Sequence, residues 1–140
     1  MIEKSKIQDE LNFASDRLSS QVRTIALGTL ALSWGLLVAE TPNAKVVAND
    51  LRWNLILVGG LAVLVLFLDF LQYLAGYLNA LKAFKSVVKD ASGNEVGQFD
   101  NKAWSHRLRR FFFFSKIVLL AITVGWLLLA LGRWLVRSNG

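Results

Sequence analysis

The chain has 140 residues, of which 54% are hydrophobic and 19% are charged, and its formal net charge at pH 7 is +6. Soluble domains carry about 25% charged residues, so this composition favours a membrane protein and excludes intrinsic disorder. With no Cys and a single His, the chain also excludes a disulfide scaffold, a Cys-ligated zinc site and a thiol nucleophile.

Three uncharged stretches, each 16 residues long, occupy residues 24–39, 53–68 and 117–132. At about 1.5 Å per residue each spans about 24 Å, so flanking residues must help to cross a hydrocarbon core of about 30 Å. No wet, polar face recurs at helical spacing within them, which disfavours the alternative of three buried helices in a soluble protein. We therefore predict three membrane spans, at about residues 22–40, 52–76 and 112–136.

The predicted helices extend beyond these spans. Apolar residues recur every three or four positions over residues 7–22, which is a helical period, so the first helix should cover about residues 4–39. Pro42 should end it, because proline cannot continue a helix.

The second helix should begin at Asn49 or Asp50, which are good N-caps, and end near Lys89. A turn is expected at residues 90–97, and the third helix should run from about residue 101 to about residue 136. No β-strand is expected. The parts of the helices outside the spans, at residues 2–21, 77–90 and 100–111, should pack into a small helical bundle.

The basic residues predict how the chain is oriented. With three spans, the N-terminus and the second loop share one side of the membrane, and that side holds 12 of the 16 Lys and Arg residues. Because basic residues concentrate on the cytoplasmic side, the N-terminus and the helical bundle should be cytoplasmic and the C-terminus external, in a cell inner membrane. The predicted fold is an all-α integral membrane protein of one domain, residues 1–140, with three long helices running up, down and up in an oligomeric bundle.

Arg23, Asp69 and Lys116 end their spans on the inner side, at one depth. A lone charge near hydrocarbon is unfavourable, so Asp69 is expected to pair with Arg23, Lys116 or both, within one chain or across subunits. Asp69 would then be either a packing clamp or a gate residue. If the second span instead lies further toward the C-terminal end of its helix, Asp69 is nearer the middle of the membrane, and a functional role for Asp69 is then favoured. The corresponding outer charges are Glu40, Arg52 and Arg133.

A second group of charges lies between the second and third spans, where residues 79–116 carry eight basic and three acidic residues. This face can contact anionic lipid, or it can bind a phosphorylated ligand such as a nucleotide or an oligonucleotide. Trp104 and the four consecutive Phe residues 111–114 offer faces on which bases could stack. The residues expected to bind an anionic ligand are Lys82, Lys85, Lys89, Arg107, Arg109 and Arg110.

Small residues form a stripe along the first span, where Thr24, Gly28, Ala31 and Gly35 follow one another at steps of four, three and four. Small faces allow helices to approach closely. The stripe can pack within the chain, or it can form an oligomer contact or line a pore. The residues expected at a pore or gate are Thr24, Gly28, Gly35 and Asp69.

No catalytic group of residues is recognisable, and neither a metal nor a cofactor is expected. Prokaryotic diacylglycerol kinases are similar in size and number of spans, but residues 69–76 lack the acid pair and the Asn of that family's second span. We therefore do not expect an enzyme.

The few spans, the long helical extensions and the missing enzyme motif resemble small membrane effectors of bacterial anti-phage systems, such as SLATT-like and nucleotide-gated proteins. The resemblance implies a homo-oligomeric, ion-conducting pore that is controlled from its cytoplasmic bundle by a nucleotide, an oligonucleotide or a regulatory protein. The alternative is a structural or partner-binding membrane subunit that does not conduct.

Overall fold

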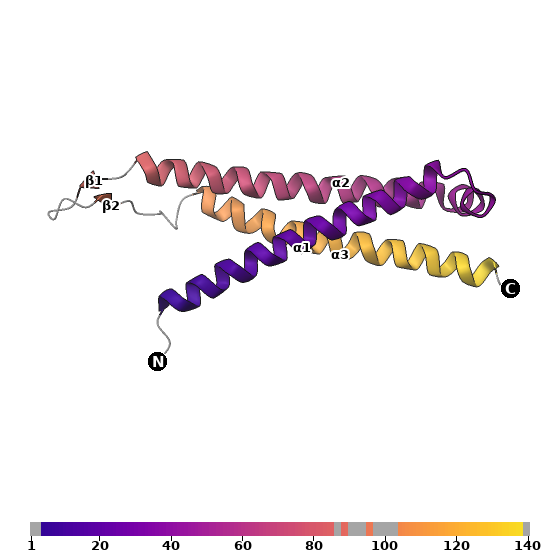
Figure 1. The fold of residues 1–140 in the computed structure, drawn as a ribbon, viewed down its shortest axis with the longest axis horizontal. Coiled ribbons are helices and arrows are strands. Elements are labelled where there is room, and N and C mark those ends of the chain that lie inside the picture. Colours follow the sequence, from indigo (N-terminus) through magenta and orange to yellow (C-terminus); the bar gives the residue numbers. More distant parts are fainter. Residues whose placement is uncertain (1–3, 86–87, 90–94, 97–103, 139–140) are drawn as a thin grey trace.

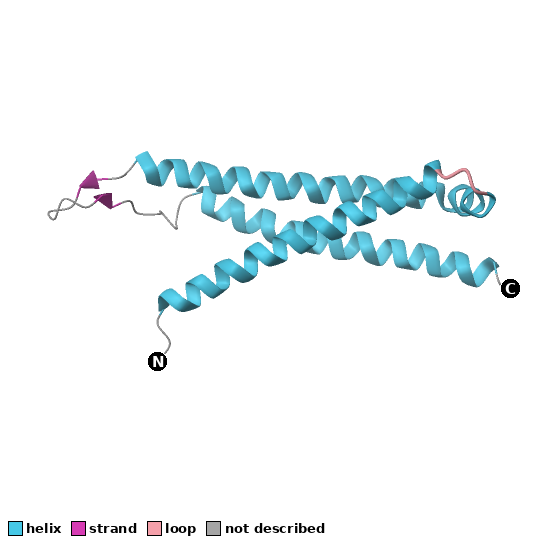
Figure 2. Ribbon diagram, viewed as in Figure 1, coloured by secondary structure: helices cyan, strands magenta, loops and turns pink. Residues whose placement is uncertain are grey.

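The computed structural model describes residues 4–85, 88–89, 95–96 and 104–138 of the chain. Three long helices make up nearly all of this part (Figure 1): α1 (Lys4–Val38), α2 (Pro42–Lys85) and α3 (Trp104–Ser138). The all-helical prediction is confirmed but for two short strands, β1 (Val88–Lys89) and β2 (Glu95–Val96), which pair antiparallel beyond the end of α2 (Figure 2). The sequence analysis expected the second helix to continue to about Lys89, whereas α2 ends at Lys85, and it expected a turn at residues 90–97. Residues 90–94 and 97 of that turn lie outside the described part.

The second helix begins earlier than predicted, at Pro42 rather than at Asn49 or Asp50. Proline is well suited to the first position of a helix, because its fixed φ is helical and its missing N–H is not needed there. The first hydrogen bond of the helix runs from Lys45 N to Thr41 O over 3.0 Å. Pro42 therefore starts α2 and does not merely end α1. The first turns of α2 are seen nearly end-on in Figure 1, whereas the rest of the helix runs across the view, along the long axis of the molecule.

Helix α2 is the centre of the packing, because it contacts both α1 and α3 whereas α1 and α3 touch each other little. In Figure 1, α1 runs obliquely across the pair that α2 and α3 form. Gly59 permits the close approach of α1, since a Cβ atom at this position would lie 3.3 Å from Trp34 Nε1. Most of the buried apolar residues fall into two clusters, Val22 with Ala26, Val65 and Leu120, and Leu51 with Leu55, Val58 and Leu127.

Large apolar side chains cover the outside of all three helices, as Ile25, Phe70 and Leu128 illustrate with exposed fractions of 48%, 59% and 65%. Polar side chains instead lie between the helices. The buried polar residues of the described part are Ser19, Thr29, Ser33, Asp69, Gln72, Lys116 and Thr123. This distribution is the reverse of that in a soluble bundle, whose outer faces are polar.

All three helices are long and apolar enough to cross a membrane. The suitable segments are Phe13–Val38, Pro42–Leu78 and Arg107–Ser138. Each is longer than the predicted span, and the difference is largest for α2, whose segment begins at Pro42 rather than at residue 52. The number of candidate spans agrees with the prediction.

Candidate functional site

A cluster of charged and polar side chains joins all three helices near the middle of the bundle. Asp69 of α2 is its centre. Arg23 of α1 donates through Nε to Asp69 Oδ2 over 3.0 Å, and Arg23 Nη2 lies 2.8 Å from the same oxygen. Lys116 of α3 forms an ion pair with Asp69 Oδ1. Asp69 thus contacts both basic residues that the sequence analysis named, within a single chain.

Ser19 completes this group, which we call the charged cluster: Ser19, Arg23, Asp69 and Lys116. The Ser19 hydroxyl donates to Asp69 Oδ1 over 2.9 Å, and it accepts a hydrogen bond of 2.6 Å from Lys116 Nζ. Ser19 and Arg23 lie one helical turn apart on α1, so both side chains reach the same carboxylate. The sequence analysis missed Ser19, although its spacing from Arg23 was a usable signal.

The members of the charged cluster differ in how far they are buried. Lys116 has no exposed surface, and the whole residues Ser19 and Asp69 are 1% and 4% exposed. Arg23 keeps 45% of its side chain exposed and lies over the ring of Tyr73, 5.2 Å from its centroid. A buried ammonium group is tolerable only with a close counter-charge, so Lys116 depends on Asp69.

The sequence analysis considered two positions for Asp69, one at the inner end of its span and one nearer the middle of the membrane. Arg23, Asp69 and Lys116 each lie nine or ten residues inside the nearer end of their apolar helix segments. At about 1.5 Å per residue this is about 14 Å along each helix axis. The cluster therefore lies well within these helix segments, and the depth of Asp69 in a membrane stays a prediction.

The arrangement suits a clamp better than a reaction centre. Both carboxylate oxygens of Asp69 already accept hydrogen bonds from cationic side chains, so the group is not free to act as a base. One buried acceptor nearby is unused: among the described residues, Gln72 Oε1 has no hydrogen-bond donor. Within the same part of the chain, no group of three or more His, Cys, Asp or Glu side chains could hold a metal ion.

The small-residue face of α1, formed by Thr24, Gly28, Ala31 and Gly35, points away from the other two helices. All four residues are exposed, and a Cβ atom at Gly28 or Gly35 would meet nothing within 4 Å. Packing within the chain therefore does not explain this face. The neighbouring pair Thr29 and Ser33 does face inward, and the Ser33 hydroxyl donates to Thr29 O over 2.8 Å.

The basic residues of α3 that were expected to bind an anion are exposed on the surface. This holds for Arg107, Arg109 and Arg110. Arg109 also lies against α2, because its Cδ atom would be 3.8 Å from a Cβ at Gly76. The side chains of the other three expected residues, Lys82, Lys85 and Lys89, lie outside the described part of the chain.

The outer charges form no counterpart to the charged cluster. Among the residues that the structure describes, both ion pairs involve Asp69, and Glu40 and Arg52 are exposed. Arg133 instead lines a pocket between α2 and α3.

Comparisons of the chain with protein-family models, with curated proteins and with solved structures found no match.

Proposed function

We propose that this protein crosses the membrane three times, with a cytoplasmic N-terminus, and assembles through α1 into a homo-oligomeric effector that conducts ions. The observation that carries the proposal is the exposed small-residue face of α1, which no other part of the chain covers in the described structure. Helices α2 and α3 present large apolar side chains outward, as lipid contact requires. Helix α1 also exposes large apolar side chains, such as Ile25 and Leu32, but it carries in addition an exposed face of small and weakly polar residues.

The small-residue face suits contact with another copy of the chain better than contact with lipid. Helix association in membranes depends on close packing, which residues such as Gly28 and Gly35 allow. Three spans in one chain cannot enclose a water-filled path, so a pore needs several copies. In a ring of subunits with α1 toward the axis, the Thr24 hydroxyl would line the water-filled path. Its proton is donated to Ser20 O over 3.1 Å, so its oxygen could accept a hydrogen bond from water in the path.

The charged cluster is the proposed gating element. Arg23 directly precedes Thr24, so the bonds from Arg23 and Ser19 to Asp69 fix the rotation of the small-residue face relative to α2 and α3. On α3, residues 107–110 are continuous in one helix with Lys116. A nucleotide or oligonucleotide bound to these Arg residues would open the pore if it bound the open state more tightly than the closed state.

A second candidate function is a structural or partner-binding membrane subunit that does not conduct. The observation in its favour is that the charge of Asp69 is neutralised inside the protomer, so it offers nothing to a passing ion. In this case the small-residue face would contact a copy of the chain or a partner helix without water between them. A role in anti-phage defence is part of the first proposal and rests on the resemblance in organisation.

One experiment separates the two candidates. Purified protein is reconstituted into planar bilayers, and its oligomeric state is measured in parallel by crosslinking in liposomes. We expect an oligomer with discrete conductance, and we expect Gly28→Leu with Gly35→Leu to abolish both. Gly60→Leu is the matched control, because Gly60 is an exposed glycine on α2 that also has nothing within 4 Å of a built Cβ.

The outcomes have different meanings. An oligomer that stays silent in the bilayer, with and without added nucleotides, supports the non-conducting subunit. A monomer overturns the pore. If the Gly60→Leu control disrupts assembly as much as the α1 variant does, the small-residue face is not the contact.

A further inference from the structure

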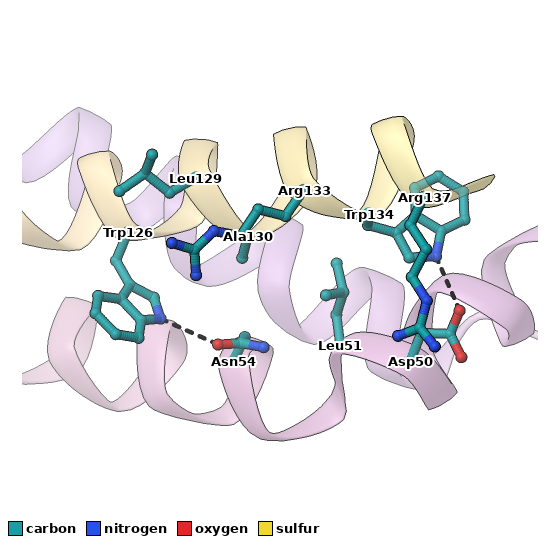
Figure 3. Close-up of a pocket in the computed structure, with 9 residues that line it drawn as sticks. All are labelled: Asp50, Leu51, Asn54, Trp126, Leu129, Ala130, Arg133, Trp134 and Arg137. Carbon is teal, nitrogen blue, oxygen red and sulfur yellow. Dashed lines mark hydrogen bonds between the residues drawn. The ribbon is translucent and has the colours of Figure 1, made fainter. Parts of the chain in front are cut away.

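A pocket of about 310 Å³ lies between α2 and α3 (Figure 3), at the end of the bundle that carries the C-terminus in Figure 1. Its polar lining comes from both helices and combines two acceptors, two indoles and two guanidinium groups. These residues, which define the tryptophan pocket, are Asp50, Asn54, Trp126, Arg133, Trp134 and Arg137.

Two hydrogen bonds fix the walls of the tryptophan pocket. Trp126 Nε1 donates to Asn54 Oδ1 over 3.1 Å, and Trp134 Nε1 donates to Asp50 Oδ2 over 3.0 Å. Each of these two indoles of α3 is therefore hydrogen-bonded to a specific residue of α2. Leu51, which is 8% exposed, lies between these two tethers. The packing of α2 against α3 therefore forms the pocket, because both hydrogen bonds join these two helices and the apolar lining residues Leu51, Leu129 and Ala130 come from both of them.

The guanidinium groups of the tryptophan pocket are available to a ligand. Arg133 and Arg137 lie one turn apart on α3, and Figure 3 shows their side chains extending toward α2. Both residues are exposed, and neither forms an ion pair within the part of the chain that the structure describes. Figure 3 shows them at different ends of the pocket, Arg137 beside Asp50 and Arg133 toward Trp126, and each guanidinium group can donate two hydrogen bonds to a phosphate group.

The Asp50 carboxylate restricts which phosphate compound fits. One of its oxygens is held by Trp134, and its negative charge disfavours a ligand that is only anionic. A ligand that also carries a primary ammonium group would satisfy the carboxylate, and the indole faces would favour the same cation. The lining thus matches a zwitterionic ligand, with phosphate at one of the two Arg residues and ammonium at Asp50.

We infer that the tryptophan pocket binds the phosphoethanolamine headgroup of a phospholipid. The inference rests on the membrane-spanning part of the proposed function, because paired Trp residues at the end of apolar helices are typical of the membrane interface. A pocket of about 310 Å³ is at the small end for ligand sites, so it holds a headgroup and not acyl chains. The exposed apolar surface of α3 next to the pocket, which includes Leu128 and Leu129, would contact the chains.

Lipid binding to the detergent-purified protein, measured by native mass spectrometry, tests the inference. We expect phosphatidylethanolamine to bind more tightly than phosphatidylglycerol, which lacks the ammonium group, and than phosphatidylcholine, whose ammonium cannot donate hydrogen bonds. Arg133→Gln with Arg137→Gln should weaken phosphatidylethanolamine binding about tenfold or more. Asp50→Asn keeps an acceptor for Trp134 but removes the charge, so it should remove the preference for phosphatidylethanolamine over phosphatidylglycerol.

Arg52→Gln is the matched control, because Arg52 lies at the same end of α2, is exposed and does not line the pocket. Equal loss in this control and in the Arg133 and Arg137 variant would overturn the inference, provided that circular dichroism shows both variants to be folded. Water-soluble glycerophosphoethanolamine distinguishes the sources of the headgroup. If it binds as tightly as the lipid, the ligand is a free phosphate compound and the lipid assignment is wrong.

Failure here is distinguishable from failure of the proposed function. Lipid binding is measured in detergent and needs neither conductance nor the contact through α1. The Gly28 and Gly35 variant should therefore lose its oligomeric state and keep its lipid preference. If the preference is lost while the parent still forms conducting oligomers, only the pocket assignment fails.

Discussion

Ser19 is buried, and its single hydroxyl group connects the charged side chains of Asp69 and Lys116. It accepts from Lys116 and donates to Asp69, so its proton can point in only one direction. A hydroxyl fits this role because it is donor and acceptor at once. Ser19 therefore links α1 to α2 and α3 together, although it carries no charge.

Ser19→Ala should destabilise the bundle by about 1–3 kcal/mol, because Lys116 and Asp69 each lose a partner and remain buried. Thermal unfolding of the detergent-purified protein, followed by circular dichroism, measures the effect. Ser20→Ala is the matched control, since Ser20 is the next residue and is exposed. Equal melting temperatures for the two variants would contradict the bridging role.

Asp69→Asn should be more damaging than Ser19→Ala, because it leaves the fully buried ammonium of Lys116 without a counter-charge. Breaking a buried ion pair in this way typically costs about 3–5 kcal/mol. Combining Asp69→Asn with Lys116→Met should recover part of the stability, since the unpaired buried charge is then gone. Unfolding of the four proteins in this cycle gives the coupling between the two residues. A double variant that is less stable than Asp69→Asn alone would contradict the ion pair as the reason for the loss.

At the scale of elements, two adjacent glycines of α2 have opposite surroundings. Gly59 faces α1, where an added Cβ would lie 3.3 Å from Trp34 Nε1, whereas Gly60 has nothing within 4 Å. Two adjacent glycines can look like one packing feature in a sequence. Of this pair, only Gly59 lies in the contact between α1 and α2. The position of α1 on α2 therefore depends on Gly59.

Gly59→Leu should destabilise the protein by about 1–3 kcal/mol, because the larger side chain pushes α1 away from α2. Gly60→Ala should leave stability unchanged or raise it by up to about 1 kcal/mol, since alanine favours helix and no neighbour is displaced. Thermal unfolding compares the stability of the two variants. Crosslinking between cysteines introduced at Ser33 of α1 and Val58 of α2 reports the separation of these two helices, because the chain has no Cys of its own. Unchanged crosslinking in Gly59→Leu would contradict the contact.

At the scale of the whole molecule, the sequence could predict the features that depend on position along the chain. Hydropathy and helical period are local properties, and they identified three long helices. The equal depths of Arg23, Asp69 and Lys116 also follow from counting residues, which is why their contact was expected. Features that depend on how each helix is rotated about its axis could not be obtained this way. Ser19 in the charged cluster and the indole tethers to Asp50 and Asn54 are of that kind.

The early start of α2 has a different cause. Proline is unfavourable inside a helix but favourable at its first position, so the same residue can mark an end or a beginning. The sequence analysis took Pro42 only as the end of α1. Placing a helix start there requires knowing that the chain turns at once, which the short link from Val38 to Pro42 shows.

The proposed orientation of the bundle in the membrane can be tested with topology reporters. Twelve of the 16 basic residues lie on the side of the N-terminus and of the link between α2 and α3. Because basic residues resist translocation, reporters at the N-terminus and between β1 and β2 should be cytoplasmic. Reporters after Gly140 and in the link between α1 and α2 should be external. Alkaline phosphatase, active only outside, and green fluorescent protein, fluorescent only inside, give opposite readings at each of the four sites. The reverse pattern would place the basic residues of α3 outside and remove a cytoplasmic ligand from the gating proposal, while the contacts of the charged cluster would stand.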